Sequence, residues 1–558
     1  AVPRRPSPTR SSAPPRRLPP LTRLPLSPMA DPAKMTDEVL RMLSPQGFNV
    51  IIVCCSNQHA EDFWQARLET TVLQVAGAPA HILAVHEDWE GGAGNGLGTL
   101  YAYMKARDKA SRLGFDLDAM LADKAAVALY HTAGKGTRLA PLPGAENNNK
   151  PGVKLPALLD VGGQQQPLTV LEAVMRQTSS YASVRPGRIS VFWGDQVFVP
   201  SAGVQKSEHA ADILAALRPM PTKAEWEAGQ LHQYGLIALG RSGDATQLEK
   251  VNYDTAMAYL PADVEKVGTS LGSFSLSGPL LAALMEEFNS ELRDKSGSLD
   301  SDPHFWMPLT LKREDYLAVM SKKGENEERA GTHYDRMRAF KAKFQPQGGG
   351  ILGCVDVGAS ALWWDYGRLE LYQTNNLHVT EEGLSPHLLR LFLKLQAAEA
   401  PESDVSGRQQ GNTLGVDVVV DKGAVVLNSR IATGRIGAGC VVVNVTAPKV
   451  VLEHVILMGV TSIGPIEGKR GVLYNVVHET EGEVLDANAV RADVFMSDGR
   501  HLAIKSSMDI DGGKAWKEKV MGNELSFEEV YKANQSLDVA QCQRASAAAH
   551  ARVAASVP

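Results

Sequence analysis

The stretch KAAVALYHTAGKGTRLAPL, residues 124–142, places a short apolar run directly before a loop that contains glycines. The run Lys124–Tyr130 is continuous rather than alternating, which is typical of a strand buried on both faces of a parallel sheet. Gly134 and Gly136 follow, with Lys135 between them. Glycine permits positive φ and close approach of a phosphate, and ligands of open α/β sheets bind at the carboxyl ends of the strands. The sequence therefore predicts a nucleotide-binding loop at this strand end.

Segments on both sides of this loop alternate between strand and helix patterns. The strand patterns lie within residues 47–72, 81–89, 124–130 and 188–200, and the helix patterns lie within residues 37–43, 47–72, 91–106 and 167–181. Such alternation implies right-handed crossovers and helices on both faces of a sheet. We therefore predict an α/β fold with a doubly wound, mostly parallel sheet.

The glycine loops do not identify their ligand by themselves. A Walker A loop has Ser or Thr directly after its lysine, whereas Gly136 follows Lys135 here, so this loop is not a P-loop. A second glycine stretch, AGNGLG at residues 93–98, is better explained as an ordinary turn when it is taken alone. The functional prediction depends on the segments that accompany these loops.

Several short segments follow the first loop in order. They are GKGTRLAPL (134–142), ENNNKPGVKLPALLDVGG (146–163), VFWGDQVF (191–198), QLEKVNYD (247–254), TSLGSFSLSGPLL (269–281) and DVGASALWWDYGRLELYQTNN (356–376). This order resembles the sugar-1-phosphate nucleotidyltransferases, or NDP-sugar pyrophosphorylases. The stretches VIIVCCSNQHAEDFW (50–64) and GNGLGTLYAYM (94–104) are similar to the opening of the fucose-1-phosphate guanylyltransferase branch. The resemblance covers residues 45–480.

The resemblance implies an enzyme that joins an NTP to a sugar 1-phosphate and releases pyrophosphate. It implies that the nucleotide phosphates are bound by Gly134, Lys135, Gly136 and Thr137. It also implies that Arg138 neutralises the leaving pyrophosphate, because a guanidinium is a planar, bidentate donor. Lys154 lies where the family has its catalytic phosphate-binding lysine, and Lys150 is the rival for that role. The sequence leaves the choice between these two lysines open.

The later motifs imply a metal and a sugar site. Asp195 and Asp365 match the family's Mg²⁺ ligands, and hard carboxylate oxygens suit this ion. Glu249 and Lys250 match the pair that contacts the sugar, although Val251 replaces the family's usual proline. The loop GKGTRL is more similar to uridylyltransferases than to guanylyltransferases. Both GTP with fucose 1-phosphate and UTP with a hexose 1-phosphate therefore stay open.

The pattern changes after the polar stretch at residues 399–412, which we interpret as a linker. Short Val/Ile steps recur over Val418–Gly464 with glycines between them. This pattern resembles imperfect hexapeptide turns of a left-handed β-helix, a frequent C-terminal partner in the family. A plain β-sandwich is the alternative, because only IGAGCV (436–441) fits the hexapeptide well.

These patterns predict five regions. They are a disordered leader (1–40), a nucleotidyltransferase catalytic domain (41–395), a linker (396–412), a β-helix-like domain (413–535) and a disordered, low-complexity tail (536–558). Residues 1–28 contain six arginines and nine prolines but no acidic residue. This composition fits either an organellar transit peptide or translated sequence upstream of a start at Met29.

The composition limits the partners. A net charge of −6 provides no polycationic face, which argues against nucleic acid as the main partner. The five cysteines form no CxxC pair, so we expect free thiols in a reducing compartment. No apolar run approaches the length of a membrane helix, so we expect no membrane partner. We expect a cytoplasmic protein, or a plastid protein if residues 1–28 are a transit peptide.

Two classes of function remain. The first is the sugar-1-phosphate nucleotidyltransferase, with the C-terminal domain available for a homo-oligomer. The second is a catalytically silent relative that acts as a regulatory or scaffold subunit. Arg138, Lys154, Asp195 and Asp365 occur together, which favours the enzyme, because a scaffold does not need two carboxylates and a cationic loop at one sheet edge.

Overall fold

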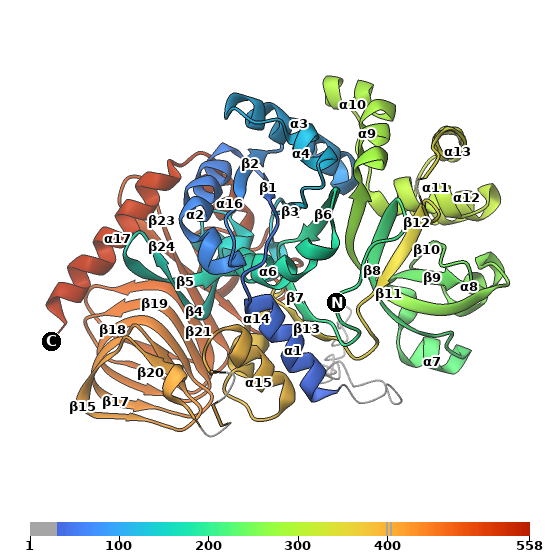
Figure 1. Ribbon diagram of the computed structural model, residues 1–558. Helices are drawn as coiled ribbons and strands as arrows, with labels where there is room; N and C mark the ends of the chain where they lie inside the picture. The colour runs from blue at the N-terminus through green and yellow to red at the C-terminus, as the bar shows by residue number, and fades with distance from the viewer. Residues whose placement is uncertain (1–30, 347, 398–399, 402–403, 558) are drawn as a thin grey trace, which may run out of the picture.

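The computed structural model describes residues 31–557 apart from 347, 398–399 and 402–403, so residues 1–30 of the expected leader (1–40), including the possible transit peptide at 1–28, lie outside the described residues. The described residues of the first domain form a nine-stranded sheet with the order β10-β9-β11-β6-β3-β1-β2, to which β8 is added beside β11 and β12 beside β8 (Figure 1). The strands are β1 (Val50–Cys55), β2 (His81–His86), β3 (Val127–His131), β6 (Arg188–Trp193), β8 (Ala211–Pro219), β9 (Gly235–Gly240), β10 (Ala245–Glu249), β11 (Val264–Ser277) and β12 (Leu352–Asp356).

The centre of this sheet is parallel and buried on both faces. β1 pairs in parallel with β2 and β3, and β3 pairs in parallel with β6. Successive residues of β1 enter opposite cores: Ile51 packs into one hydrophobic cluster and Ile52 into the other. Continuous apolar runs are required where both faces are covered, so the prediction of a buried parallel centre is confirmed.

Helices cover both faces of the sheet (Figure 1). One cluster receives side chains from α1 (Pro32–Leu43), α2 (Gln58–Ala76) and α6 (Val170–Thr178), and the other receives them from α3 (Gly94–Arg112), α4 (Leu117–Ala122) and α9 (Gly278–Glu287). The sequence sets the ends of these helices. α2 begins where Asn57 accepts a hydrogen bond from the Ala60 amide and ends at Gly77, which has a φ of 70°.

The other side of the sheet is antiparallel apart from the parallel pair of β8 and β12, so the sheet is mixed and not mostly parallel as expected. β11 runs antiparallel to β6, β8 and β9, and β9 and β10 form a hairpin. A short turn can only connect antiparallel strands, and here it replaces a crossover helix. The elements packed around this hairpin are α7 (Lys223–Ala228), α8 (Tyr253–Tyr259), α12 (Arg313–Lys322) and α13 (Glu327–Lys343), and they form the lobe at the right of Figure 1.

Two short antiparallel strand pairs lie outside the main sheet and carry residues of the candidate site. β4 (Lys154–Val161) and β5 (Gln164–Thr169) form a hairpin, and β7 (Gln196–Val199) pairs antiparallel with β13 (Leu362–Asp365). The single strand expected at residues 188–200 is therefore interrupted at Gly194 and Asp195. This break turns the chain out of the main sheet at the carboxyl end of β6.

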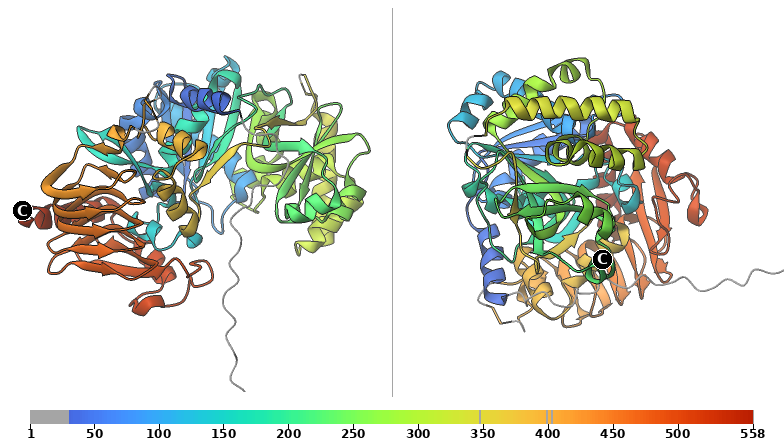
Figure 2. Two further views of the ribbon diagram at one scale, coloured as in Figure 1. Left: turned by 90° about the horizontal axis from the view of Figure 1, so that it is seen from below. Right: turned by 90° about the vertical axis from the view of Figure 1, so that its right-hand side faces the viewer.

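The second domain is another β-sheet structure, seen as stacked strands in Figure 2. Its strands are β14 (Gln409–Gln410), β15 (Thr413–Val420), β16 (Val425–Leu427), β17 (Arg430–Ile436), β18 (Val441–Leu452), β19 (Val455–Ser462), β20 (Ile466–Gly468), β21 (Gly471–His478), β22 (Glu483–Leu485), β23 (Ala489–Phe495) and β24 (His501–Ser507). Val425, Val441, Ile456 and Val472 stand side by side on successive parallel strands. Only the last pair, β23 and β24, is antiparallel among the described strands of this sheet.

The expected disorder of the tail at residues 536–558 is wrong for the described residues. α16 (Phe527–Gln535) is followed by α17 (Val539–Ser556), which buries Cys542, Ala549 and Val553. α17 lies against β19, β21 and β23. Alanine-rich sequence has high helix propensity, and packing on a sheet supplies the stability that a low-complexity segment lacks alone.

Two other boundaries also change. α1 begins at Pro32 and buries Met35 and Val39, so residues 31–40 are not a disordered leader. Part of the expected linker lies outside the described residues, but Gln409–Gln410 already forms β14 beside β16. None of the helices among the described residues is both long and apolar enough to cross a lipid bilayer.

Candidate active site

The glycine loop leaves the end of β3 and leads toward Lys150. Thr132 anchors its start, because the amide and the hydroxyl of Thr132 donate to the Cys54 carbonyl at 3.0 and 2.8 Å. Gly134 and Gly136 have φ values of 126° and 64°, which residues with a side chain rarely adopt. A Cβ on Gly134 would meet no atom within 4 Å, whereas a Cβ on Gly136 would lie 3.2 Å from the Lys150 Cβ. The loop is therefore open at Gly134 and packed against the chain at Gly136.

Two carboxylates meet beside this loop although they are far apart in the sequence. The ladder of β7 and β13 pairs Asp365 with Gln196. The Tyr366 amide donates to the Asp195 carbonyl at 3.0 Å, which holds the two turns together. A Cβ on Gly367 would lie 2.9 Å from Asp195 Oδ2 and 3.0 Å from Asp365 Oδ1. Both carboxylates therefore border the same small space.

Cationic side chains accompany this carboxylate pair. Lys150, in the turn η2 (Lys150–Gly152), places its Nζ 2.5 Å from Asp195 Oδ2. Burial raises the pKa of Asp365, the charge of Asp195 raises it further, and the Gly367 amide, Lys150 and Arg138 oppose the rise. Added positive charge would therefore favour the ionised form of Asp365. The structure brings together Arg138, Lys150, Asp195 and Asp365 from four separate sequence motifs.

The second candidate lysine lies elsewhere. Lys154 opens β4, and its Nζ lies 2.9 Å from Glu146 Oε2. The other oxygen of Glu146 accepts a hydrogen bond from the Tyr474 hydroxyl, and the Lys154 amide donates to the same hydroxyl at 3.0 Å. Tyr474 belongs to β21 of the second domain. Lys154 is therefore part of the junction between the domains, not of the carboxylate pair at Asp195.

Glu249 and Lys250 lie in the β9–β10 lobe. Glu249 Oε1 is 3.1 Å from Lys250 Nζ and 3.7 Å from Lys323 Nζ. A Cβ on Gly235 would be 2.8 Å from Glu249 Oε2 and 3.8 Å from Asp302 Oδ2. Burial raises the pKa of Asp302 to about 7, and the negative charge of Glu249 adds to the rise. The structure thus groups the predicted sugar-contacting pair with a carboxyl group that sequence reasoning did not single out.

The AGNGLG stretch has a structural explanation. It opens α3, and the Gly96 amide donates to the Leu299 carbonyl at 2.8 Å. A Cβ on Gly94 would lie 2.6 Å from the same carbonyl oxygen. The Asn95 amide donates to Asp300 Oδ1 at 2.9 Å. These glycines allow the chain to approach the segment that leads to Asp302, as an ordinary tight turn would.

Sequence reasoning missed a polar group at the ends of β2, β3 and β6. His131 Nε2 lies 2.8 Å from Thr99 Oγ1, and the His131 ring stacks on Trp193 with 5.2 Å between centroids. Burial lowers the pKa of His131 to about 4, so this ring is neutral at physiological pH. Burial raises the pKa of Glu87, whose Oε1 accepts a hydrogen bond from the Ala93 amide at 2.8 Å. His131 directly follows the strand predicted at residues 124–130 and Glu87 lies near the end of the strand predicted within residues 81–89, and these positions were the only available signal.

The second domain also packs on the glycine-loop segment. A Cβ on Gly512 would lie 2.6 Å from the Thr137 carbonyl oxygen. The Asn148 side chain donates to the Tyr531 carbonyl at 2.7 Å, and Lys135 Nζ lies 5.9 Å from the centre of the Tyr531 ring. The loop is therefore held between the main sheet and the second domain.

The carboxylate pair could supply part of the ligand set of a metal ion. Among the described residues, no group of three or more His, Cys, Asp or Glu side chains could hold a metal ion. Asp195 and Asp365 supply two carboxylates, and Mg²⁺ commonly takes one or two from a protein while phosphates and waters complete its octahedron. Lys150 already pairs with Asp195. The pair therefore fits Mg²⁺ only together with substrate oxygens.

Comparison with known proteins adds no assignment to this geometry. No protein-family model matches the chain, and no curated protein matches it.

Proposed function

We propose that this protein is a sugar-1-phosphate nucleotidyltransferase, which forms an NDP-sugar and pyrophosphate from an NTP and a sugar 1-phosphate. One observation supports the proposal: Lys150 packs against Gly136 of the glycine loop and pairs with Asp195, and the charges of Arg138, Lys150 and Asp195 all act on Asp365. Ligands of open α/β sheets bind at the carboxyl ends of the strands. Two carboxylates with two cations suit a reaction between two polyanions, in which positioning and neutralisation supply most of the catalysis.

The chain's own groups have distinct proposed roles. An oxygen of the sugar 1-phosphate attacks the α-phosphorus, the bond from that phosphorus to the bridging oxygen breaks, and pyrophosphate leaves with the electron pair. The amides of Gly134 to Thr137 bind the phosphates, and the exposed Arg138 neutralises the leaving pyrophosphate. We propose Lys150, rather than Lys154, as the phosphate lysine, because Lys150 lies beside Asp195.

We propose Mg²⁺ as the cofactor and Asp195 and Asp365 as its protein ligands. Bound there with substrate phosphates, the ion would neutralise charge that develops on the phosphate oxygens. Asp365 is partly destabilised in its ionised form by burial and by Asp195, so a cation between the two groups would relieve this repulsion. Lys150 would then be released from Asp195 to contact phosphate.

The sugar is proposed to extend toward Glu249 and Lys250, where Asp302 adds a second carboxyl group. Carboxyl groups are suitable partners for sugar hydroxyls because they accept hydrogen bonds. GTP with fucose 1-phosphate and UTP with a hexose 1-phosphate remain the two substrate pairs under this proposal.

We also propose that the second domain is a left-handed β-helix that supports the fold. The parallel succession of β16, β18, β19 and β21 supports a coiled arrangement over a sandwich. Its contacts with Thr137 and Asn148 support a role in holding the glycine loop. A homo-oligomer through this domain stays a prediction, and light scattering of the full chain tests it.

A nucleotide-by-sugar panel tests the function. GTP, UTP and ATP are each combined with fucose 1-phosphate, glucose 1-phosphate and galactose 1-phosphate, with Mg²⁺ or EDTA, and released pyrophosphate is measured. We expect one pair to dominate and EDTA to abolish release. A folded protein that releases no pyrophosphate with any pair, yet keeps its two-domain structure, would instead favour the catalytically silent regulatory or scaffold subunit.

A further inference from the structure

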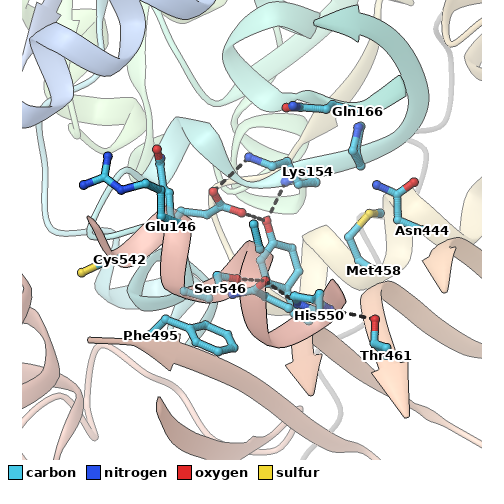
Figure 3. Close-up of a pocket in the computed structure, with 18 of the residues that line it drawn as sticks. Glu146, Lys154, Gln166, Asn444, Met458, Thr461, Phe495, Cys542, Ser546 and His550 are labelled. Carbon is cyan, nitrogen blue, oxygen red and sulfur yellow. Dashed lines mark hydrogen bonds and ion pairs between the residues drawn. The ribbon is translucent and has the colours of Figure 1, made fainter. Parts of the chain in front are cut away.

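A large cavity lies between the two domains, away from the carboxylate pair. Its volume is about 790 Å³, within the range of small-molecule sites. Glu146 and Lys154 of the first domain form one wall (Figure 3). Asn444 of β18 and Thr461 of β19 form the opposite wall, and His550 of α17 lies across the cavity from Lys154. α17, which the sequence pattern predicted to be part of a disordered tail, therefore forms part of the cavity lining.

The wall is rich in hydrogen-bond donors. The Gln166 Oε1 accepts from Arg67 at 2.7 Å, and the Asn444 Oδ1 accepts from Asn428 at 2.8 Å. Both carbonyl oxygens are thus engaged, which leaves the two NH₂ groups of Gln166 and Asn444 for a ligand. Arg67, Lys154 and Arg544 supply positive charge to the lining, and Glu146 supplies negative charge. A donor-rich, positively charged wall selects a ligand rich in acceptor oxygens and negative charge.

Two lining cations differ in how well they are already neutralised. Arg67 is held by Glu172 at 2.8 Å and contributes little free charge. Arg544 of α17 is exposed and makes no ion pair with any described residue. Met458 and Phe495 provide apolar surface in the same cavity, which suits the C–H face of a sugar ring (Figure 3). The wall therefore combines anion-binding groups with a surface for a carbohydrate.

We propose that this interdomain cavity is a binding site for a phosphorylated sugar or polyol, distinct from the glycine-loop site. Arg544 and Lys154 bind the phosphate, Gln166 and Asn444 donate to hydroxyl oxygens, and α17 closes the site. An anion bound at Lys154 competes with Glu146, which now lies 2.9 Å from the lysine Nζ.

A ligand anion that displaces Glu146 from Lys154 would also affect the glycine loop. Glu146 directly follows α5 (Leu142–Ala145), and Pro143 of that helix lies 3.1 Å from the position of a Cβ on Gly136. Release of Glu146 therefore alters the support beneath the loop. This step rests on the proposed function, and it predicts that a cavity ligand changes nucleotide affinity by at least threefold.

Calorimetric titration of the full-length protein without nucleotide tests the site. The probes are glucose 6-phosphate, ribose 5-phosphate and glycerol 3-phosphate, with glucose as the neutral control. We expect at least one phosphate to bind and glucose to bind at least tenfold more weakly. Arg544→Gln and Asn444→Leu should each weaken that binding about tenfold. Arg552→Gln removes the same charge from α17 at a residue paired with Glu479, outside the cavity, and should change nothing.

The outcomes separate the cavity from the proposed function. No binding by any of the three phosphates, or binding that Arg544→Gln and Asn444→Leu leave unchanged, overturns the cavity site. Phosphate binding that depends on Arg544 supports the site even if the protein binds no NTP, which would instead refute the proposed function. If NTP binds with the same affinity in the presence and absence of the cavity ligand, the coupling through Glu146 is overturned.

Discussion

Asp195 and Asp365 point their carboxylates at one place in the backbone, with oxygens 2.9 and 3.0 Å from the position of a Cβ on Gly367. The ladder between β7 and β13 produces this convergence, and Lys150 neutralises part of it at 2.5 Å from Asp195. Two carboxylates held this close repel each other unless a cation lies near. This arrangement is the basis of the proposal that the pair binds a metal ion together with phosphate.

The first prediction concerns this pair. Asp195→Asn and Asp365→Asn should each lower Mg²⁺-dependent pyrophosphate release by 100-fold or more, because loss of a metal ligand costs several kcal/mol of transition-state stabilisation. Asp365→Asn should also preserve or raise stability, since its ionised form is disfavoured in the fold. Asp160→Asn, at an exposed position of β4, is the matched control. Parent-like turnover in both folded variants would show that these carboxylates are not the metal ligands.

The two lysines should separate in their effects. Lys150→Met should lower turnover more than tenfold, since Lys150 lies at the carboxylate pair, and should lower the melting temperature only when Mg²⁺ is absent, because the two carboxylates then lack a cation. Lys154→Met should mainly lower stability, because it leaves the Glu146 carboxylate without its cationic partner at the domain junction. Turnover and thermal melting of both variants check this. The opposite pattern would return the phosphate role to Lys154.

Gly136 should be needed for nucleotide binding, for a reason that the structure makes specific. A valine there must adopt an unfavourable φ, and its Cβ would meet Lys150 and Pro143 within about 3.2 Å. We expect Gly136→Val to weaken NTP binding at least tenfold in calorimetric titration. Gly163→Val imposes a similar positive φ in the β4–β5 turn, where a Cβ meets nothing within 4 Å, and should leave binding unchanged. Equal NTP affinity in Gly136→Val and the parent would contradict this role.

Asp302 should make the stability of the folded protein depend on pH. Burial and the charge of Glu249 raise the pKa of Asp302 in the folded state to about 7, whereas in the unfolded state this carboxyl has its ordinary pKa of 3.8. Between these values the unfolded state loses its proton first, so Asp302 lowers stability as pH rises through this window. Asp302→Asn should therefore stabilise the protein by roughly 1 to 3 kcal/mol at pH 8 and by much less at pH 5. Urea denaturation at both pH values measures this, and a difference independent of pH would refute it.

Sequence reasoning was correct where a local residue pattern matches the burial and backbone conformation found in the fold. The run before His131 predicted a buried strand because both faces of β3 are covered, and the glycines after it predicted a tight loop. The sequence could not distinguish Lys150 from Lys154. The turn η2 (Lys150–Gly152) separates the two lysines, and in the folded chain their side chains lie in different parts of the structure. It missed α17 because the helix is stabilised by packing on the second domain. Asp302 was also missed, because only folding brings it beside Glu249.

Tracking the α-phosphate tests the central claim most directly. The parent protein is incubated with Mg²⁺, an α-³²P-labelled NTP and the sugar 1-phosphate that gives pyrophosphate in the panel, and the products are separated. Our account predicts that the label enters an NDP-sugar in amounts equal to the pyrophosphate released, and that Asp195→Asn forms at least 100-fold less. Label that appears in nucleoside monophosphate or diphosphate, with none in an NDP-sugar, would contradict nucleotidyl transfer at this site.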